Sequence, residues 1–237
     1  VQGSSSTSNP KIDITASYEG LEGTTVSVYS GDIDVAASDD GVNAANSDLG
    51  ERSDKYAINI AGGDLYIDAG SDGLDSNNDI TMTGGKVEVY GADAMMDAAI
   101  DYDGTFTLSG GTLFGAGMEP GAGTQAYVAV GETSPSGGHG GMGGGQGMTR
   151  PDKTDGSTMT PPDGQQSGTR PEKPSGDKNG WTGGKGQSAN RESALGIKEG
   201  SVITVQDASG KTLYTATALG SMSSVIFSSA DIKEGET

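Results

Sequence analysis

The sequence predicts an all-β protein whose fold is a right-handed parallel β-helix, and a recurring motif is the first reason. The motif Asp72-Gly73-Leu74-Asp75 has three relatives in the same half of the chain. They are Glu19-Gly20-Leu21-Glu22, Asp40-Gly41-Val42-Asn43 and the shorter Ala99-Ile100-Asp101. Longer segments superpose without gaps: 11–22 on 32–43, 31–46 on 63–78, and 75–87 on 101–113. Repetition on this scale indicates one supersecondary unit stacked on copies of itself.

Alternating apolar residues between the motifs are the second reason, because a period of two is typical of half-buried strands. One family of strands contains Ile12/Ile14, Ile33/Val35, Leu65/Ile67, Val87/Val89 and Leu113. A second family contains Val26/Val28, Ile58/Ile60, Ile80/Met82 and Phe106/Leu108.

Glycines between the two families are the third reason. Gly31, Gly62-Gly63, Gly84-Gly85 and Gly110-Gly111 are expected at tight corners, where the backbone needs positive φ. A coil that advances one rung per repeat stacks such corners ~4.8 Å apart. The alternative is a β-sandwich with Gly-rich turns, whose hairpins would not stack identical corners.

The chain is expected to divide into three parts. Residues 1–131 form the coils, with a Ser-rich lead-in at 1–10 and surplus loops at 46–55 and 93–98. Residues 132–193 are rich in Gly, Pro and Ser, and are predicted to be a flexible insertion. Residues 194–237 are predicted to form a small antiparallel unit that caps the open edge of the β-helix. Its strands are expected at 202–205, 212–215 and 225–227, with a turn at 208–210.

The composition limits the possible partners. The 237 residues include 33 acidic and 14 basic side chains, which gives a net charge of −19, and no cysteine. Nucleic acids and anionic membranes are bound through Lys and Arg patches, so neither is expected as a partner. The charge favours binding of cations, or of anionic matter through cations. No stretch approaches the ~20 apolar residues of a membrane span.

Stacking of the repeated motif has an electrostatic consequence. It places Glu19, Asp40 and Asp72 in one column, and Glu22, Asn43, Asp75 and Asp101 in the next. Two carboxylates one rung apart repel by about 3.5 kcal/mol at a surface-like effective dielectric. The columns are therefore either half protonated or neutralised by cations, and at neutral pH we expect cations.

The residue types at these corners predict the cation. Carboxylate and amide oxygens without His or Cys suit a hard ion, and irregular spacing suits Ca²⁺ better than octahedral Mg²⁺. Asp39 and Asp103 flank the columns and are predicted to complete the coordination. The alternative is that these acids are solvated turn residues, because Asp-Gly is a common turn dipeptide.

Four stretches of the chain resemble the clostridial carbohydrate-binding β-helix family. They are 18–23 (YEGLEG), 38–45 (SDDGVNAA), 72–77 (DGLDSN) and 99–104 (AIDYDG). The resemblance covers residues 12–118 and resumes at 201–236. It implies an extracellular or cell-surface, calcium-binding protein with a pectate-lyase-like fold, which binds cellulose and acidic plant or microbial polysaccharides such as polygalacturonate without cleaving them. Family members usually have further coils before the first motif, so the chain is expected to be a C-terminal part, and the insertion after Gly131 is a departure.

The basic residues do not favour an enzyme. A lyase of this shape would need an Arg or Lys base beside a calcium-bound uronate. Arg150, Arg170 and Arg191 fall in the predicted insertion, and Lys86 lies on an outward strand position. We therefore expect a binding protein rather than an enzyme.

Two further expectations concern surfaces. Tyr66, Tyr90 and Phe114 occupy outward positions and are predicted to form an exposed ridge on which sugar rings stack, although lone aromatics on a sheet face are common. As an alternative function, a calcium-neutralised β-helix would suit a surface, matrix or filament protein whose chains associate end to end.

Overall fold

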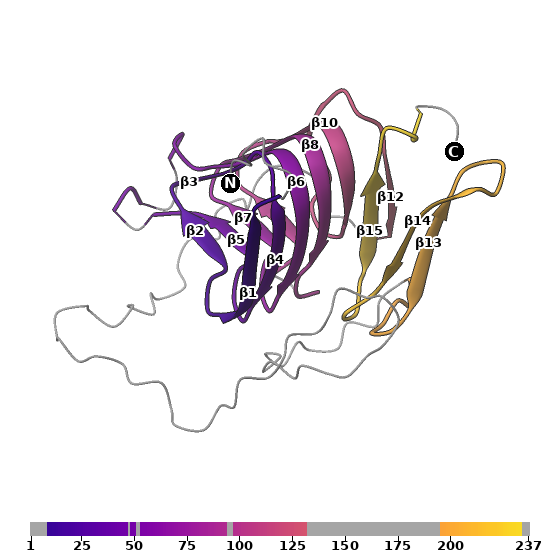
Figure 1. Ribbon diagram of the computed structural model, residues 1–237, viewed down its shortest axis with the longest axis horizontal. Helices are drawn as coiled ribbons and strands as arrows, with labels where there is room; N and C mark the ends of the chain where they lie inside the picture. The colour runs from indigo at the N-terminus through magenta and orange to yellow at the C-terminus, as the bar shows by residue number, and fades with distance from the viewer. Residues whose placement is uncertain (1–8, 47, 51–52, 94–96, 132–194, 234–237) are drawn as a thin grey trace, which may run out of the picture. The chain divides into compact units, whose positions relative to one another are not determined.

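The computed structural model describes residues 9–46, 48–50, 53–93, 97–131 and 195–233 (Figure 1). All regular secondary structure in these residues is β, which confirms the predicted all-β class. No helix in this part of the chain is long and apolar enough to cross a membrane. The predicted insertion and the middle of the 93–98 loop lie outside the described residues, and the proposed division into three parts remains a prediction.

The strands form two parallel arrays, seen side by side in Figure 1. The larger array is the parallel part of a nine-stranded sheet, and it comprises β1 (Lys11–Ser17), β4 (Asp32–Ala37), β6 (Ala57–Ala69), β8 (Asp79–Tyr90) and β10 (Phe106–Gly115), with β3 (Thr25–Val28) paired to β6. The smaller sheet has four parallel strands in the order β2 (Leu21–Gly23), β5 (Val42–Ala44), β7 (Leu74–Ser76) and β9 (Ile100–Tyr102).

The strand register confirms the predicted superpositions. Lys11 pairs with Asp32, and Asp32 pairs with Asp64. In the small sheet, Leu74 pairs with both Val42 and Ile100. Each copy of the motif therefore lies directly over the next, as the repeats in the sequence require.

The two predicted strand families are not separate in the later repeats. In β6, β8 and β10 they merge into one long strand that bends at its glycines. Gly63 has φ +98°, and a Cβ there would lie 3.1 Å from the carbonyl oxygen of Gly31. The expected corner is thus a bulge with a register shift, because glycine lets the backbone bend while pairing continues on both sides.

The core lies between the two parallel arrays. Ile33, Leu65, Val87 and Leu113 form one buried row on the larger sheet, and Leu74 and Ile100 face them from the small sheet. Burial of each such side chain contributes about 1.5–3 kcal/mol. The stacked rows therefore supply the main driving force for packing of each repeat on the next.

The C-terminal segment joins the larger sheet. β15 (Ser224–Ser228) pairs antiparallel with β10 on one side and with β12 (Tyr127–Gly131) on the other. The predicted hairpin is also present, as β13 (Val202–Gln206) and β14 (Thr212–Thr217), and Gly210 in its turn has φ +82°. The strand edge of β10 that would otherwise be open is thus partly covered from the same chain.

Candidate metal centre

The small sheet positions the acidic side chains. Glu22, Asn43, Asp75 and Asp101 are register partners on β2, β5, β7 and β9. One step earlier in each coil, Gly20 N–H donates to Asp40 O (2.9 Å) and Gly41 N–H donates to Asp72 O (2.8 Å). Both predicted columns are therefore stacked in the structure.

Glycine in the second position of the motif allows the coils to approach this closely. A Cβ on Gly41 would contact Ile67 Cγ2 and would lie 2.6 Å from the carbonyl oxygen of Gly73. A Cβ on Gly73 would lie 2.6 Å from the carbonyl oxygen of Ala99 and contact Val89 Cγ2. The acids are consequently held one rung apart by a backbone packing that only glycine permits.

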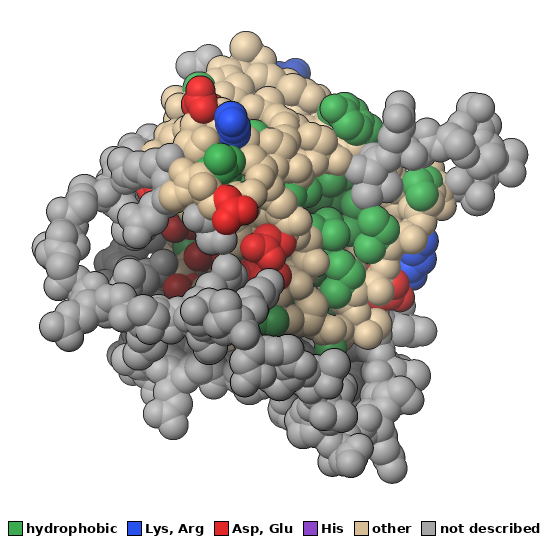
Figure 2. Space-filling view, turned by 90° about the vertical axis from the view of Figure 1, so that its left-hand side faces the viewer, with side chains coloured by type: hydrophobic (Ala, Val, Ile, Leu, Met, Phe, Trp, Pro, Cys, Tyr) green, Lys and Arg blue, Asp and Glu red, His purple; other side chains and the backbone are tan. Residues whose placement is uncertain are grey.

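Three carboxylates come together at the end of the columns that lies towards β9. One oxygen each from Asp72, Asp75 and Asp101 lies within 4.8 Å of the others. Asp72 is 8% exposed, and its Oδ1 accepts a hydrogen bond of 2.5 Å from Ala98 N–H. Figure 2 shows acidic side chains gathered around a hollow, on the face toward β2 and β3.

A second group of polar side chains continues the columns towards β2. Asp40 Oδ1 accepts from the backbone N–H of Asp72 (3.1 Å), and Asp40 Oδ2 accepts from Asn43 Nδ2 (3.0 Å). Glu19 Oε2 and Asn43 Oδ1 are buried and have no hydrogen-bond partner among the described residues. Buried acceptors of this kind need a donor, a water molecule or a cation.

Burial and mutual repulsion raise the pKa values of these acids. Burial raises the pKa of Asp72 to about 9, with further contributions from Asp75, Asp101 and Asp40. Burial, followed by Asp40 and Asp101, raises the pKa of Asp75 to about 7. Burial and Asp40 raise the pKa of Glu19 to about 7, and burial also raises that of Asp40. A positive ion at this position would favour the charged forms and reverse these shifts.

The oxygens of the columns are suited to a hard cation. Ca²⁺ takes six to eight oxygen ligands, including carboxylates, amide carbonyls and backbone carbonyls. The cluster offers three converging carboxylates, and two further buried oxygens of the columns lack hydrogen-bond partners. The residues present therefore fit the ion that the sequence predicts.

The remaining predicted ligands occupy the margins of the site. Glu22 is exposed, and Asp39 and Asp103 are half-buried. Asp103 lies close enough to contribute to the raised pKa of Asp75. The sequence reasoning missed Asp97, whose charge contributes to the raised pKa of Asp40. Asp97 belongs to the surplus loop at 93–98, where no repeat marks its position.

A family model described as a carbohydrate-binding domain-containing protein matches residues 5–236. The chain belongs to this family. The match includes the acidic columns, the larger sheet and the C-terminal hairpin. No curated protein and no solved structure matches the chain.

Carbohydrate-binding modules often stack sugar rings on exposed aromatic side chains, but the predicted ridge is not exposed here. Tyr66, Tyr90 and Phe114 do lie in a row, with ring centroids 5.9 and 6.0 Å apart. Their exposed fractions are only 8%, 4% and 0%. The expectation of a solvent-exposed ridge is wrong because a second hydrophobic cluster, with side chains from β14 and β15, covers these rings.

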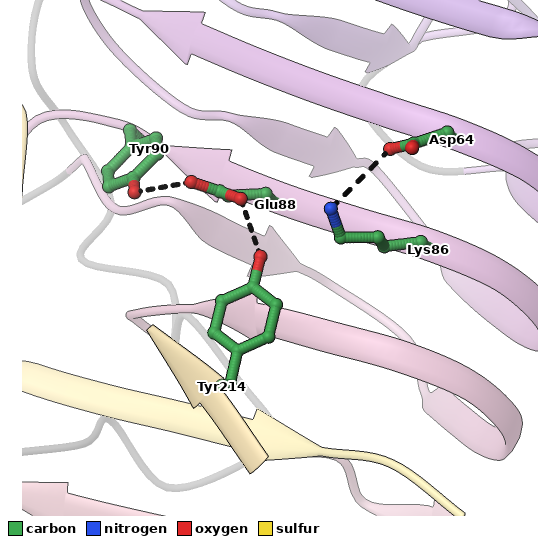
Figure 3. Close-up of polar contacts among 5 residues, drawn as sticks. All are labelled: Asp64, Lys86, Glu88, Tyr90 and Tyr214. Atoms are coloured by element: carbon green, nitrogen blue, oxygen red, sulfur yellow. Dashed lines mark hydrogen bonds and ion pairs between the residues drawn. The ribbon is translucent and has the colours of Figure 1, made fainter. Parts of the chain in front are cut away.

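A buried carboxylate ties this cover to β8 (Figure 3). Glu88 is 8% exposed, and its two oxygens accept hydrogen bonds from the hydroxyls of Tyr90 (2.8 Å) and Tyr214. Lys86 pairs with Asp64 (3.9 Å) and lies 5.8 Å from the centre of the Tyr214 ring. The hairpin is thus held by polar contacts as well as by aromatic stacking, and we assign these residues a structural role.

Proposed function

We propose that this protein binds extracellular polysaccharide without cleaving it, through calcium held by the acidic columns. Its family supports carbohydrate as the ligand class. The observation that carries the metal is the convergence of the Asp72, Asp75 and Asp101 carboxylates within 4.8 Å. We further infer that the coils wind as a right-handed parallel β-helix, which the parallel register of successive repeats supports.

Some residues of the columns would bind the ion, and others would shape the site. Asp72, Asp75 and Asp101 would hold it, and Asn43 and Glu19 would supply further oxygens. A calcium ion, when bound, supplies positive charge and open coordination positions to which uronate carboxylates and sugar hydroxyls bind. The chain itself keeps the oxygens one rung apart, and its backbone N–H groups orient Asp40 and Asp72.

Two of the described lysines are paired with carboxylates on the larger sheet. Lys86 pairs with Asp64 on the larger sheet, and Lys11 pairs with Asp13 and Asp34. Neither lysine belongs to the small sheet that carries the acids. A lyase requires a base that reaches the carbon losing its proton, so these two lysines do not provide one at the columns.

The expected ligand is an acidic plant or microbial polysaccharide such as polygalacturonate, with cellulose as a second candidate, outside the cell or at its surface. The alternative of filaments made by end-to-end stacking is less well supported. The parallel repeats could not continue directly from β10 into another chain at residues 113–115, because β15 already pairs antiparallel with β10 there.

Affinity electrophoresis in gels containing polygalacturonate tests the proposal. Retardation is expected to be stronger with calcium than with a chelator. The double variant Asp72→Asn/Asp75→Asn should lose this calcium-dependent part of the retardation and the calcium heat in calorimetry. Asp54→Asn removes an exposed carboxylate outside the columns and is the matched control. Retardation of the double variant that still increases with calcium would contradict the role of the columns.

A further inference from the structure

A groove is lined by residues outside the small sheet that carries the acidic columns. Its volume is about 990 Å³, which is near the upper end of typical ligand pockets, about 300–1,000 Å³. It is formed by Ser109 of β10, residues 123–127 and residues 229–233. None of these described lining residues belongs to β2, β5, β7 or β9, so the groove is separate from the candidate metal centre.

Hydrogen bonds fix the polar lining of the groove in place. Gln125 Nε2 donates to Gly111 O (2.8 Å) and to Ser228 Oγ (2.7 Å). Tyr127 OH donates to Glu119 Oε2 (2.9 Å). These bonds use both N–H donors of Gln125 and leave its amide oxygen as an acceptor. A groove whose walls are already ordered loses little conformational entropy when a ligand binds.

The lining has the chemistry that recognises a sugar. Hydroxyls come from Ser109, Thr124 and Ser229, an amide from Gln125, and an aromatic ring from Tyr127. Such groups donate to and accept from the many hydroxyls of a saccharide, and an aromatic ring packs against its C–H face.

The charge of the lining is opposite to that of the chain. The whole chain has a net charge of −19, yet the only charged residue among the described lining residues is Lys233, which is exposed. A neutral saccharide could accept a hydrogen bond from this ammonium group but would gain no charge pairing from it. A carboxylate would gain a charge-assisted hydrogen bond.

We propose that this groove is a direct binding site for a uronic-acid saccharide, with Lys233 pairing with a sugar carboxylate. The proposal rests on the proposed carbohydrate-binding function and adds a site that works without calcium. Thr124, Ser229 and Gln125 contact the sugar hydroxyls, and Tyr127 packs against a ring. The protein would then hold an acidic polysaccharide at two places, once through a cation and once through its own lysine.

The test is calorimetry of the full chain with trigalacturonate, and with the neutral trimer cellotriose, both in a chelator. Lys233→Glu should weaken trigalacturonate binding by about tenfold or more, because an attraction becomes a repulsion. The matched control Lys211→Glu makes the same charge change at an exposed residue that directly precedes β14 and lies outside the groove lining. This variant should leave the affinity for trigalacturonate within about twofold. Thr124→Trp should abolish binding by filling the groove, whereas Thr83→Trp at an exposed position outside it should not.

Three other results would overturn the proposal in different ways. Trigalacturonate binding that requires calcium and is unchanged in both groove variants would remove this site and leave the proposed function intact. Equally tight binding of cellotriose, blocked by Thr124→Trp, would show a groove for neutral sugars instead of acidic ones. The absence of any saccharide binding, with or without calcium, would overturn the proposed function together with the groove.

Discussion

Single side chains at the columns control how the stability of the protein depends on pH. Asp72, Asp75 and Glu19 have folded-state pKa values of about 9, 7 and 7, whereas an unfolded Asp or Glu titrates near pH 4. A carboxyl group with a raised folded pKa contributes its full stability below about pH 4. That contribution is lost as the pH rises through the folded pKa.

The calcium-free protein should therefore become less stable between pH 5 and pH 9. Each carboxyl group that keeps its proton only in the folded state lowers the free energy of unfolding by roughly 1.4 kcal/mol per pH unit at the steepest point. The effect is smaller for the half-exposed Glu19. Urea denaturation in a chelator at several pH values measures this slope. Asp72→Asn should flatten it, and a slope that is unchanged in the variant would show that the charge of Asp72 does not carry the effect.

Substitution of the glycine at the second motif position should also destabilise the protein. Gly41→Ala places a Cβ against Ile67 and the carbonyl of Gly73, so we expect a loss of about 1–3 kcal/mol in the free energy of unfolding. Gly220→Ala is the control, because nothing lies within 4 Å of a Cβ there. Chemical denaturation of both variants gives the comparison, and equal stability of the two would contradict the close approach.

At the scale of elements, one buried carboxylate contributes to the docking of the β13–β14 hairpin, together with apolar packing. Glu88 accepts hydrogen bonds from Tyr90 and Tyr214 (Figure 3). Tyr214 also stacks on Phe114, with ring centroids 5.4 Å apart. Desolvation and the hydrogen bond to Glu88 both raise the pKa of the Tyr214 phenol, which keeps it a donor. The hairpin, rather than a sugar, thus occupies the aromatic ridge.

Removal of one hydroxyl should weaken this contact. Tyr214→Phe leaves a buried Glu88 oxygen with one partner fewer, and we expect a loss of about 1–3 kcal/mol in the free energy of unfolding. Tyr29→Phe is the matched control, since Tyr29 is 58% exposed. The two variants are compared by thermal and urea denaturation. Identical midpoints would mean that the hydrogen bond adds nothing to docking of the hairpin.

At the scale of the whole molecule, the C-terminal segment covers a strand edge and an aromatic row that the repeats alone would leave exposed. β15 pairs with β10 and β12, and its neighbours cover Tyr66, Tyr90 and Phe114. An uncovered strand edge beside an apolar surface favours pairing with another chain.

Removal of residues 195–237 should therefore cause association. The shortened chain is expected to form oligomers or aggregates at concentrations where the full chain does not, as measured by light scattering during gel filtration. A monomeric shortened chain would show that the repeats are sufficient by themselves and that β15 is not needed to protect the edge of β10.

The sequence by itself determined the register of the coils and the acidic columns, because each repeat pairs with a copy of itself. The relation of residues 11–22 to 32–43 directly specifies which backbone atoms pair, and with them the stacking of Glu22 on Asn43. The repeated glycine pairs did not distinguish a corner between two strands from a bulge within one strand, and no repeat marks the place of Asp97 in an irregular loop.

Only the tertiary structure decided which outward side chains remain exposed. Tyr66 and Tyr214 are far apart in the chain, and no periodicity relates them, so the burial of the aromatic row depends on packing between distant segments. The same is true of the groove, which combines Ser109, residues 123–127 and residues 229–233. Local patterns determine pairing between repeats, whereas contacts between unlike segments depend on shape, and shape appears only when the chain is folded.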